Sequence, residues 1–236
     1  MSKKYLNKTC AYCGADRSST TADHVIARLF FHEEDRSNLP KVPACARCNN
    51  LKSQLELYVL SVMPLGGLQP KAGDMLRNFV DRRLQKNNAL RTTLAVGARH
   101  RLFWSIESGW QEGMTMPFDS EKLTELSRLI AQGLAWHHWR LQLAPEADIR
   151  ANMFSAEGEA HWQKVWKHPS WTEHVCATLG NGEFSYRGVR ARDSSMTSLW
   201  QMTYFGGAQL GADPDKPGQT TKSVFVASME NGAWKV

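Results

Sequence analysis

The chain has 236 residues, of which 42% are hydrophobic, and its nine Trp and nine Phe exclude a disordered or low-complexity chain. Its formal net charge is +6, and the charge is uneven: residues 1–100 carry 16 Lys and Arg against 8 Asp and Glu, whereas the remainder carries 13 against 15. A positive field in one half favours an anionic partner such as nucleic acid, although the solvated surface of a basic protein explains the same balance.

The longest apolar stretch, Leu57 to Leu68, is interrupted by Ser61, Pro64 and two glycines, so it is too short and broken to span a bilayer. The charged N-terminus is not followed by the apolar run of a secretory signal. We therefore expect a cytoplasmic protein.

Four of the five cysteines form two pairs with the same spacing, Cys10-Ala-Tyr-Cys13 and Cys45-Ala-Arg-Cys48. Two thiolates separated by two residues can face one tetrahedral ion, and two such knuckles complete a four-sulfur shell. Disulfides are the weaker explanation in a chain without an export signal. The spacing predicts a structural zinc, because a closed shell has no open position for catalysis. We assign no role to the fifth cysteine, Cys176.

The predicted elements of the first part follow in chain order. Residues 20–27 have the β-branched and apolar content of a short strand, and 32–38 form a polar loop. Residues 39–44 are extended, with prolines that confine them to an edge or a hairpin arm. A helical pattern opens at Asn49 and continues to Met63, where Pro64 ends it.

Four short motifs within this part carry a resemblance: Cys-x-x-Cys-Gly, Asp23-His24-Val, Asn38-Leu, and Val-Pro-Ala-Cys-x-x-Cys-Asn49-x-x-Lys52. Together they resemble the HNH endonuclease family in its zinc-containing ββα-metal form. The resemblance covers about residues 8–60. The family's familiar pattern has His at its third signature position, whereas this chain has Asn49, as in a His-Asn-Asn variant.

The resemblance implies metal-assisted hydrolysis of DNA, with a site that a different metal from the zinc would complete. A neutral imidazole can take a proton from water, and His24 is the candidate general base. Asp23 and Asn49 offer oxygen ligands for a hard divalent ion such as Mg²⁺. Asn38 would hold the loop and orient His24, and Lys52, one helical turn after Asn49, would contact phosphate.

Each of these residues also has a plainer interpretation. Asp23 and His24 are neighbours in a strand, where side chains alternate, so they share a site only if the backbone is twisted or bulged, as we expect. Asn49 can be a helix cap, Asn38 a turn residue and Lys52 a solvated helix residue. The nuclease interpretation is favoured because all of them occur within one zinc scaffold.

Residues 70–92 predict a second helix, with Arg77, Arg82, Lys86 and Arg91 as a basic surface that either tracks a nucleic-acid backbone or is an ordinary charged face. Residues 120–143 predict a long helix, in which the cluster Trp136-His137-His138-Trp139 is interpreted as packing because adjacent helical residues do not face each other. His32 lies in the loop, where no spacing rule places it at the site. Strands are expected at 100–106, 184–189, 199–205 and 223–227.

We therefore expect an α+β protein with an HNH nuclease module in residues 1–66 and a mixed α/β region in 67–236, whose candidate roles are target recognition, partner binding and dimerisation. Two alternatives stay open. The first is a zinc module that binds nucleic acid or protein without cutting it. The second is a nuclease subunit of a bacterial defence or phage system that a partner protein activates.

Overall fold

The protein is a mixed helix and sheet chain, seen here in a computed structural model that describes residues 3–66, 80–105, 109–191, 196–207 and 222–232. The first part contains the antiparallel pair β1 (Thr21–His24) and β2 (Lys41–Ala44), followed by helix α1 (Ala46–Val62). Four short 3₁₀ turns accompany them: η1 (Lys3–Tyr5), η2 (Arg28–Phe30), η3 (Glu33–Asp35) and η4 (Met63–Gly66).

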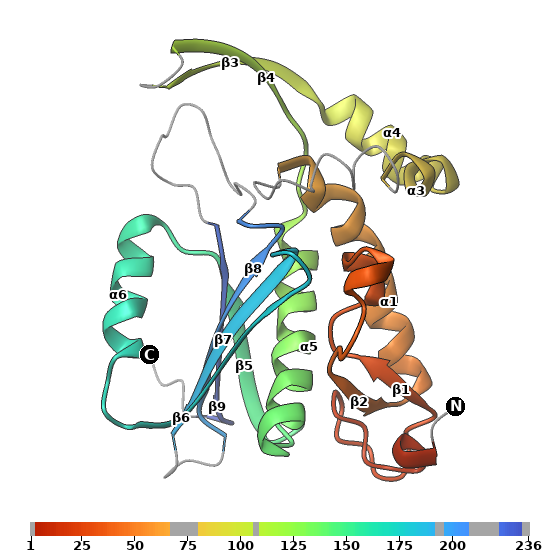
Figure 1. Cartoon of the computed structure of the whole chain (residues 1–236), viewed down its shortest axis with the longest axis vertical. Coiled ribbons are helices and arrows are strands. Elements are labelled where there is room, and N and C mark those ends of the chain that lie inside the picture. Colours follow the sequence, from red (N-terminus) through yellow and green to blue (C-terminus); the bar gives the residue numbers. More distant parts are fainter. Residues whose placement is uncertain (1–2, 67–79, 106–108, 192–195, 208–221, 233–236) are drawn as a thin grey trace.

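A five-stranded antiparallel sheet forms the second half, with the strand order β5-β9-β8-β7-β6. Helix α5 (Ser120–Trp139) lies between this sheet and the β1–β2–α1 unit, and helix α6 (Ala156–Trp166) covers the other face of the sheet (Figure 1). The strands are β5 (Ala147–Asn152), β6 (Trp171–Leu179), β7 (Phe184–Ala191), β8 (Ser198–Tyr204) and β9 (Val224–Glu230).

One hydrophobic core joins the two halves. Buried side chains of the first part, including Val25, Phe30 and Leu60, belong to the same cluster as Leu126 of α5 and Trp200 of β8. The aromatic ring of Phe30 also stacks on Phe205, with 5.7 Å between ring centroids. The predicted boundary at residue 66 is therefore not a boundary of the core, and α5 is the layer that both halves bury.

The sequence predicts one helix over residues 70–92, but the described part of this segment forms two helices. Residues 70–79 lie outside the described residues, and the rest forms α3 (Asp81–Lys86) and α4 (Asn88–Gly97). The two helices separate at Asn87, whose backbone leaves the helical region at φ −129° and ψ 76°. Its side chain accepts a hydrogen bond from the Leu90 amide at 3.1 Å, so Asn87 caps a new helix instead of continuing the first.

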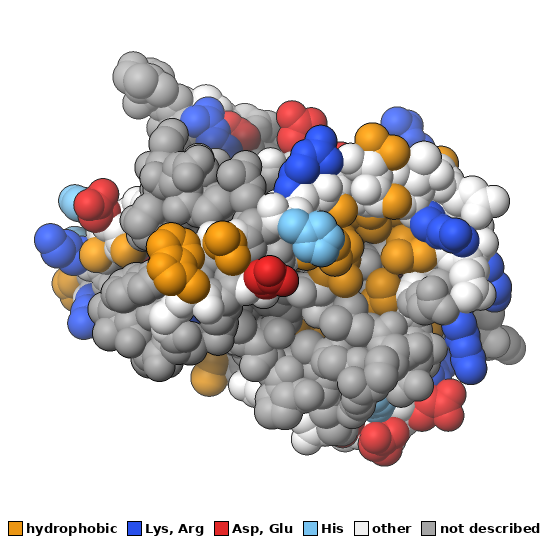
Figure 2. All heavy atoms as spheres, turned by 90° about the horizontal axis from the view of Figure 1, so that it is seen from above, with side chains coloured by type: hydrophobic (Ala, Val, Ile, Leu, Met, Phe, Trp, Pro, Cys, Tyr) orange, Lys and Arg blue, Asp and Glu red, His pale blue; other side chains and the backbone are white. Residues whose placement is uncertain are grey.

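After α4, strands β3 (Arg99–Ser105) and β4 (Gly109–Thr115) form a hairpin that projects beyond the sheet (Figure 1). Figure 2 views the molecule from this side. It shows hydrophobic side chains along the hairpin and over the region of α3 and α4, with Lys and Arg side chains at the border of these hydrophobic areas. Leu102, Trp110 and Met114 of the hairpin and Val96 of α4 are among the exposed large hydrophobic residues.

Candidate functional site

The four paired cysteines meet at the junction of the first loop and α1. The four sulfur atoms of Cys10, Cys13, Cys45 and Cys48 lie within 4.8 Å of one another, and the Sγ atoms of Cys13 and Cys45 are 3.9 Å apart. A tetrahedral zinc with bonds of about 2.3 Å separates its sulfur ligands by about 3.8 Å. The cluster therefore fits a structural metal such as zinc, as the spacing predicted.

Local backbone geometry explains how these thiols come together. Gly14 has φ +72°, and a Cβ there would lie 2.3 Å from the Ala144 carbonyl oxygen, so only glycine fits the turn that closes the first knuckle. The Sγ of Cys45 accepts a hydrogen bond from the Cys48 amide at 3.4 Å and caps α1. The helix consequently starts at Ala46, three residues before the position that the apolar pattern indicated.

Next to the first knuckle, Asp23 of β1 is held by a network of polar side chains. Its Oδ2 accepts a hydrogen bond from the hydroxyl of Tyr12 at 2.5 Å and lies 3.1 Å from Nζ of Lys52. The same Nζ donates to the His24 carbonyl oxygen at 2.8 Å and pairs with the carboxylate of Glu56. A single ammonium thus joins two carboxylates and the backbone of β1.

Burial controls the electrostatics of this network. Burial raises the pKa of Glu56 to about 7, although the Lys52 ammonium acts in the opposite direction. Burial, followed by the Asp23 charge, raises the pKa of the Tyr12 hydroxyl well above its usual value, so it stays protonated and donates to the carboxylate. The Lys52 ammonium therefore serves both Asp23 and a Glu56 side chain that is partly protonated near pH 7.

His24 ends β1 beside this network. Burial lowers the pKa of its imidazole, and the neighbouring Lys41 ammonium lowers it further, so the ring is neutral at pH 7. The ring forms no hydrogen bond within the described part of the chain. A half-buried neutral imidazole with no hydrogen-bond partner among the described residues can accept a proton from a bound molecule.

The strand itself corrects one expectation. Asp23 pairs with Val42 and His24 with Lys41 in unbroken register, so β1 contains no bulge between them. Successive side chains of a regular strand leave on opposite faces. Asp23 and His24 therefore approach the end of β1 from two sides, and they do not project together into one hollow.

The placement of Lys52 and Asn38 also differs from the expectation. Lys52 is 1% exposed, so its ammonium binds Asp23 and Glu56 and is not presented to a phosphate. Asn38 is exposed with φ +57°, a left-handed turn conformation that asparagine tolerates, and its side chain has no hydrogen bond to any described residue. The plainer turn interpretation describes Asn38 better than a role in orienting His24.

Asn49 lies in the first turn of α1, three residues before Lys52, and is half-buried. Residues at this spacing share a helix face, so Asn49 is on the side of α1 from which Lys52 reaches β1. Asp23 and Asn49 both carry side-chain oxygens, the type of ligand that a hard divalent ion prefers.

Two residues of the network, Tyr12 and Glu56, were absent from the sequence-based site. Glu56 follows Lys52 by four residues, the spacing of a helical ion pair, so a signal for that contact existed. Nothing in the sequence distinguishes Tyr12 from any other residue inside a zinc knuckle. Its role depends on the fold of the loop against β1.

In the tryptophan and histidine cluster of α5, Trp136 and Trp139 pack against the core as expected, whereas His138 is exposed and its ring lies 5.0 Å from that of His137. His138 Nε2 lies 2.9 Å from the hydroxyl of Tyr186, and Trp139 packs on Trp200 with 4.9 Å between ring centroids. Of the predicted basic surface, Arg82, Lys86 and Arg91 are exposed, and Arg77 lies outside the described residues.

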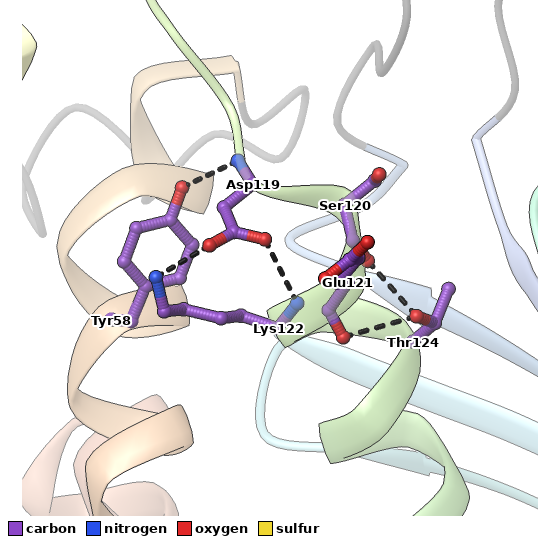
Figure 3. A network of polar contacts seen from close by, with 6 residues as sticks. All are labelled: Tyr58, Asp119, Ser120, Glu121, Lys122 and Thr124. Atoms are coloured by element: carbon purple, nitrogen blue, oxygen red, sulfur yellow. Dashed lines mark hydrogen bonds and ion pairs between the residues drawn. The ribbon is translucent and has the colours of Figure 1, made fainter.

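A separate cavity of about 510 Å³ lies between α1, α4 and the start of α5. Its wall includes Tyr58, whose hydroxyl accepts a hydrogen bond from the Asp119 amide at 2.7 Å, and Lys122, which pairs with Asp119 (Figure 3). None of the residues lining this cavity belongs to the network around Asp23.

Comparisons of the chain with protein-family models, with curated proteins and with solved structures found no match. Within the described residues, no helix combines the length and apolar character needed to cross a membrane.

Proposed function

We propose that this protein is a metal-dependent endonuclease of the HNH type that hydrolyses phosphodiester bonds in DNA, with His24 as the general base. The observation that carries the proposal is the half-buried, neutral His24 imidazole directly after a carboxylate that buried groups hold in place. The surrounding scaffold supports it, because four clustered thiols connect the loop before β1 to the start of α1. The positive balance of residues 1–100 suits a polyanionic substrate.

In this proposal the scissile phosphate lies at the end of β1, where Asp23 and His24 would approach it from the two faces of the strand. A divalent ion such as Mg²⁺, held by Asp23 and Asn49, would supply Lewis-acid stabilisation of the negative charge on the phosphoryl oxygens and on the leaving oxygen. His24 accepts a proton from water as the water oxygen forms a bond to phosphorus. The bond from phosphorus to the 3′ oxygen breaks, solvent protonates that oxygen, and the products carry a 5′ phosphate and a 3′ hydroxyl.

Zinc has a separate part in the proposal. Its four thiolates leave no position for water or substrate, so it would stabilise the loop and the start of α1 without entering the reaction. One such site cuts one strand, and a double-strand break then requires a dimer or repeated nicking.

The test compares His24→Ala with His161→Ala, which removes an exposed histidine of α6. With Mg²⁺, the His24 variant should lose plasmid nicking by about 100-fold or more, the usual scale for removing a general base. Its zinc content and circular dichroism should match those of the wild type. The His161 variant should nick normally.

Three other outcomes would reject His24 as the base or favour one of the two alternative functions. Undiminished nicking by the His24 variant would reject this residue as the base. A wild-type protein that binds zinc and DNA but never cleaves would favour the binding module. Cleavage that begins only after a co-purified partner is added would identify a partner-activated subunit.

A further inference from the structure

Tyr12 lies inside the first zinc knuckle, between Cys10 and Cys13, and is 3% exposed. Its hydroxyl donates a hydrogen bond of 2.5 Å to Oδ2 of Asp23. Its backbone carbonyl accepts a hydrogen bond from the side-chain amide of Gln132 in α5 at 3.1 Å. Tyr12 is therefore fixed at both ends, and it connects the zinc loop directly to β1.

The contacts of Asp23 are all on one oxygen. Tyr12 and Lys52 both bind Oδ2, whereas Oδ1 contacts no polar group within the described residues. The Asp23 side chain is 12% exposed, so it is accessible at one edge. A hydrogen bond and an ion pair on the same oxygen restrict the rotation of the carboxylate and leave Oδ1 as the oxygen that can meet a ligand.

Such a carboxylate has little freedom to lose when it binds a cation. Hydrogen bonds to a ligating group from its neighbours orient that group, and removing them weakens metal binding even though they never touch the metal. The Tyr12 bond is short and ends on a charged acceptor, which places it among the stronger hydrogen bonds.

We propose that Tyr12 is a positioning residue that couples the zinc site to the catalytic metal site. The thiols hold the knuckle, the knuckle holds Tyr12, and Tyr12 holds the Asp23 carboxylate. Zinc occupancy then raises the affinity of Asp23 for a divalent cation, and the cation in turn strengthens the hold on zinc, because coupling between two binding sites is reciprocal. This inference depends on the proposed function in one respect, namely that Asp23 binds the catalytic ion.

The experiment uses the full chain with one equivalent of zinc and follows Mn²⁺ binding by electron paramagnetic resonance. Tyr12→Phe keeps the ring that packs beside Lys52 and removes only the hydroxyl. It should retain zinc but bind Mn²⁺ about 10-fold more weakly, the scale expected for loss of a group that orients a ligand. Nicking should fall at low Mg²⁺ and recover when Mg²⁺ is raised.

Tyr58→Phe is the matched control. Its hydroxyl also takes part in a partly buried hydrogen bond, which it accepts from the Asp119 amide. This bond lies in the separate network of α1 and α5 (Figure 3). This variant should bind Mn²⁺ as the wild type does. Unchanged Mn²⁺ affinity in zinc-loaded Tyr12→Phe, or an equal loss in both variants, would overturn the inference.

A second measurement needs no variant that might unfold. In the wild type, saturating Mg²⁺ should raise the equilibrium affinity for zinc, measured by competition with a zinc-selective chelator, since the coupling is reciprocal. A zinc affinity that is the same with and without Mg²⁺, in a protein that does bind Mn²⁺ and nick DNA, would overturn the coupling alone. A wild type that neither binds Mn²⁺ nor nicks DNA would overturn the proposed function as well.

Discussion

Lys52 shows how one buried residue determines the local chemistry of the site. Burying an ammonium costs several kcal/mol unless its partners are close and well oriented. Here the partners are Asp23, Glu56 and the His24 carbonyl, so the lysine fastens α1 to β1 at the position of the proposed base. The same contacts withdraw it from solvent, which is why a phosphate-binding role fails for this residue.

Glu56 provides a test of the buried network through pH. Its folded-state pKa is raised to about 7 from an ordinary value of 4.5, so the folded protein keeps this proton when the unfolded chain has lost it. The free energy of unfolding should therefore fall as the pH rises toward about 7 and level off above it. Glu56→Gln removes this contribution, so the wild type should lose stability relative to the variant across that window.

Urea denaturation between about pH 5.5 and 8, with zinc in excess, measures this difference over the upper part of the window. Glu157→Gln, which changes an exposed acid in α6, controls for the loss of one negative charge. If the wild type and Glu56→Gln change in parallel with pH, Glu56 does not titrate as the buried network requires.

At the scale of elements, the tight contact between α5 and β1 sets the position of the site. A Cβ on Gly133 of α5 would lie 2.8 Å and 3.0 Å from the two methyl groups of Val25, the residue directly after His24. The absent side chain lets the helix pack closely against the end of β1. Gly133 has no positive φ, so packing is the reason for this glycine.

Gly133→Ala places two effects in opposition. Alanine favours a helix over glycine by about 1 kcal/mol, whereas overpacking a filled core costs about 1–3 kcal/mol. Val25 is fully buried and its side chain is short, so its methyl groups cannot move aside. We therefore expect the overpacking to outweigh the helix propensity, with a net loss of about 1 kcal/mol in the free energy of unfolding, measured by thermal or chemical denaturation. In a double-mutant cycle, Val25→Ala should relieve part of this loss, and additive effects would refute the contact.

The elements that sequence predicts well are those with a strong period or a specific stop signal. Helices α1 and α5 and strands β3, β7, β8 and β9 follow from their apolar patterns, and the clustering of the four paired cysteines follows from spacing alone. Strands β4, β5 and β6 and helix α6 were missed; β6 and α6 contain no fully buried residue that would mark a core-facing side. The Tyr12 contact was missed because it joins two segments whose approach depends on the tertiary fold.

At the scale of the whole molecule, the half that carries the four clustered cysteines is not an independent body. Its buried residues share a cluster with Leu126 and Ile130 of α5, and side-chain amides beyond the first 66 residues support the knuckle. Gln132 binds the Tyr12 carbonyl at 3.1 Å, and Gln142 binds the Cys10 carbonyl at 3.2 Å. The site thus depends on groups that lie more than a hundred residues along the chain from the cysteines.

A fragment of residues 1–66 should consequently fail to form the site even with zinc present. It would expose the apolar surface that α5 covers, and a chain of this size has little core to spare. We expect it to bind zinc through its four thiols yet to show no cooperative thermal transition and little dispersion in its amide NMR spectrum, whereas the full chain shows both. Zinc content measured on both samples separates loss of the metal from loss of α5. A well-dispersed spectrum for the zinc-loaded fragment would instead establish residues 1–66 as a domain that folds alone. In that case α5 would not be needed to hold Asp23 and His24 in position.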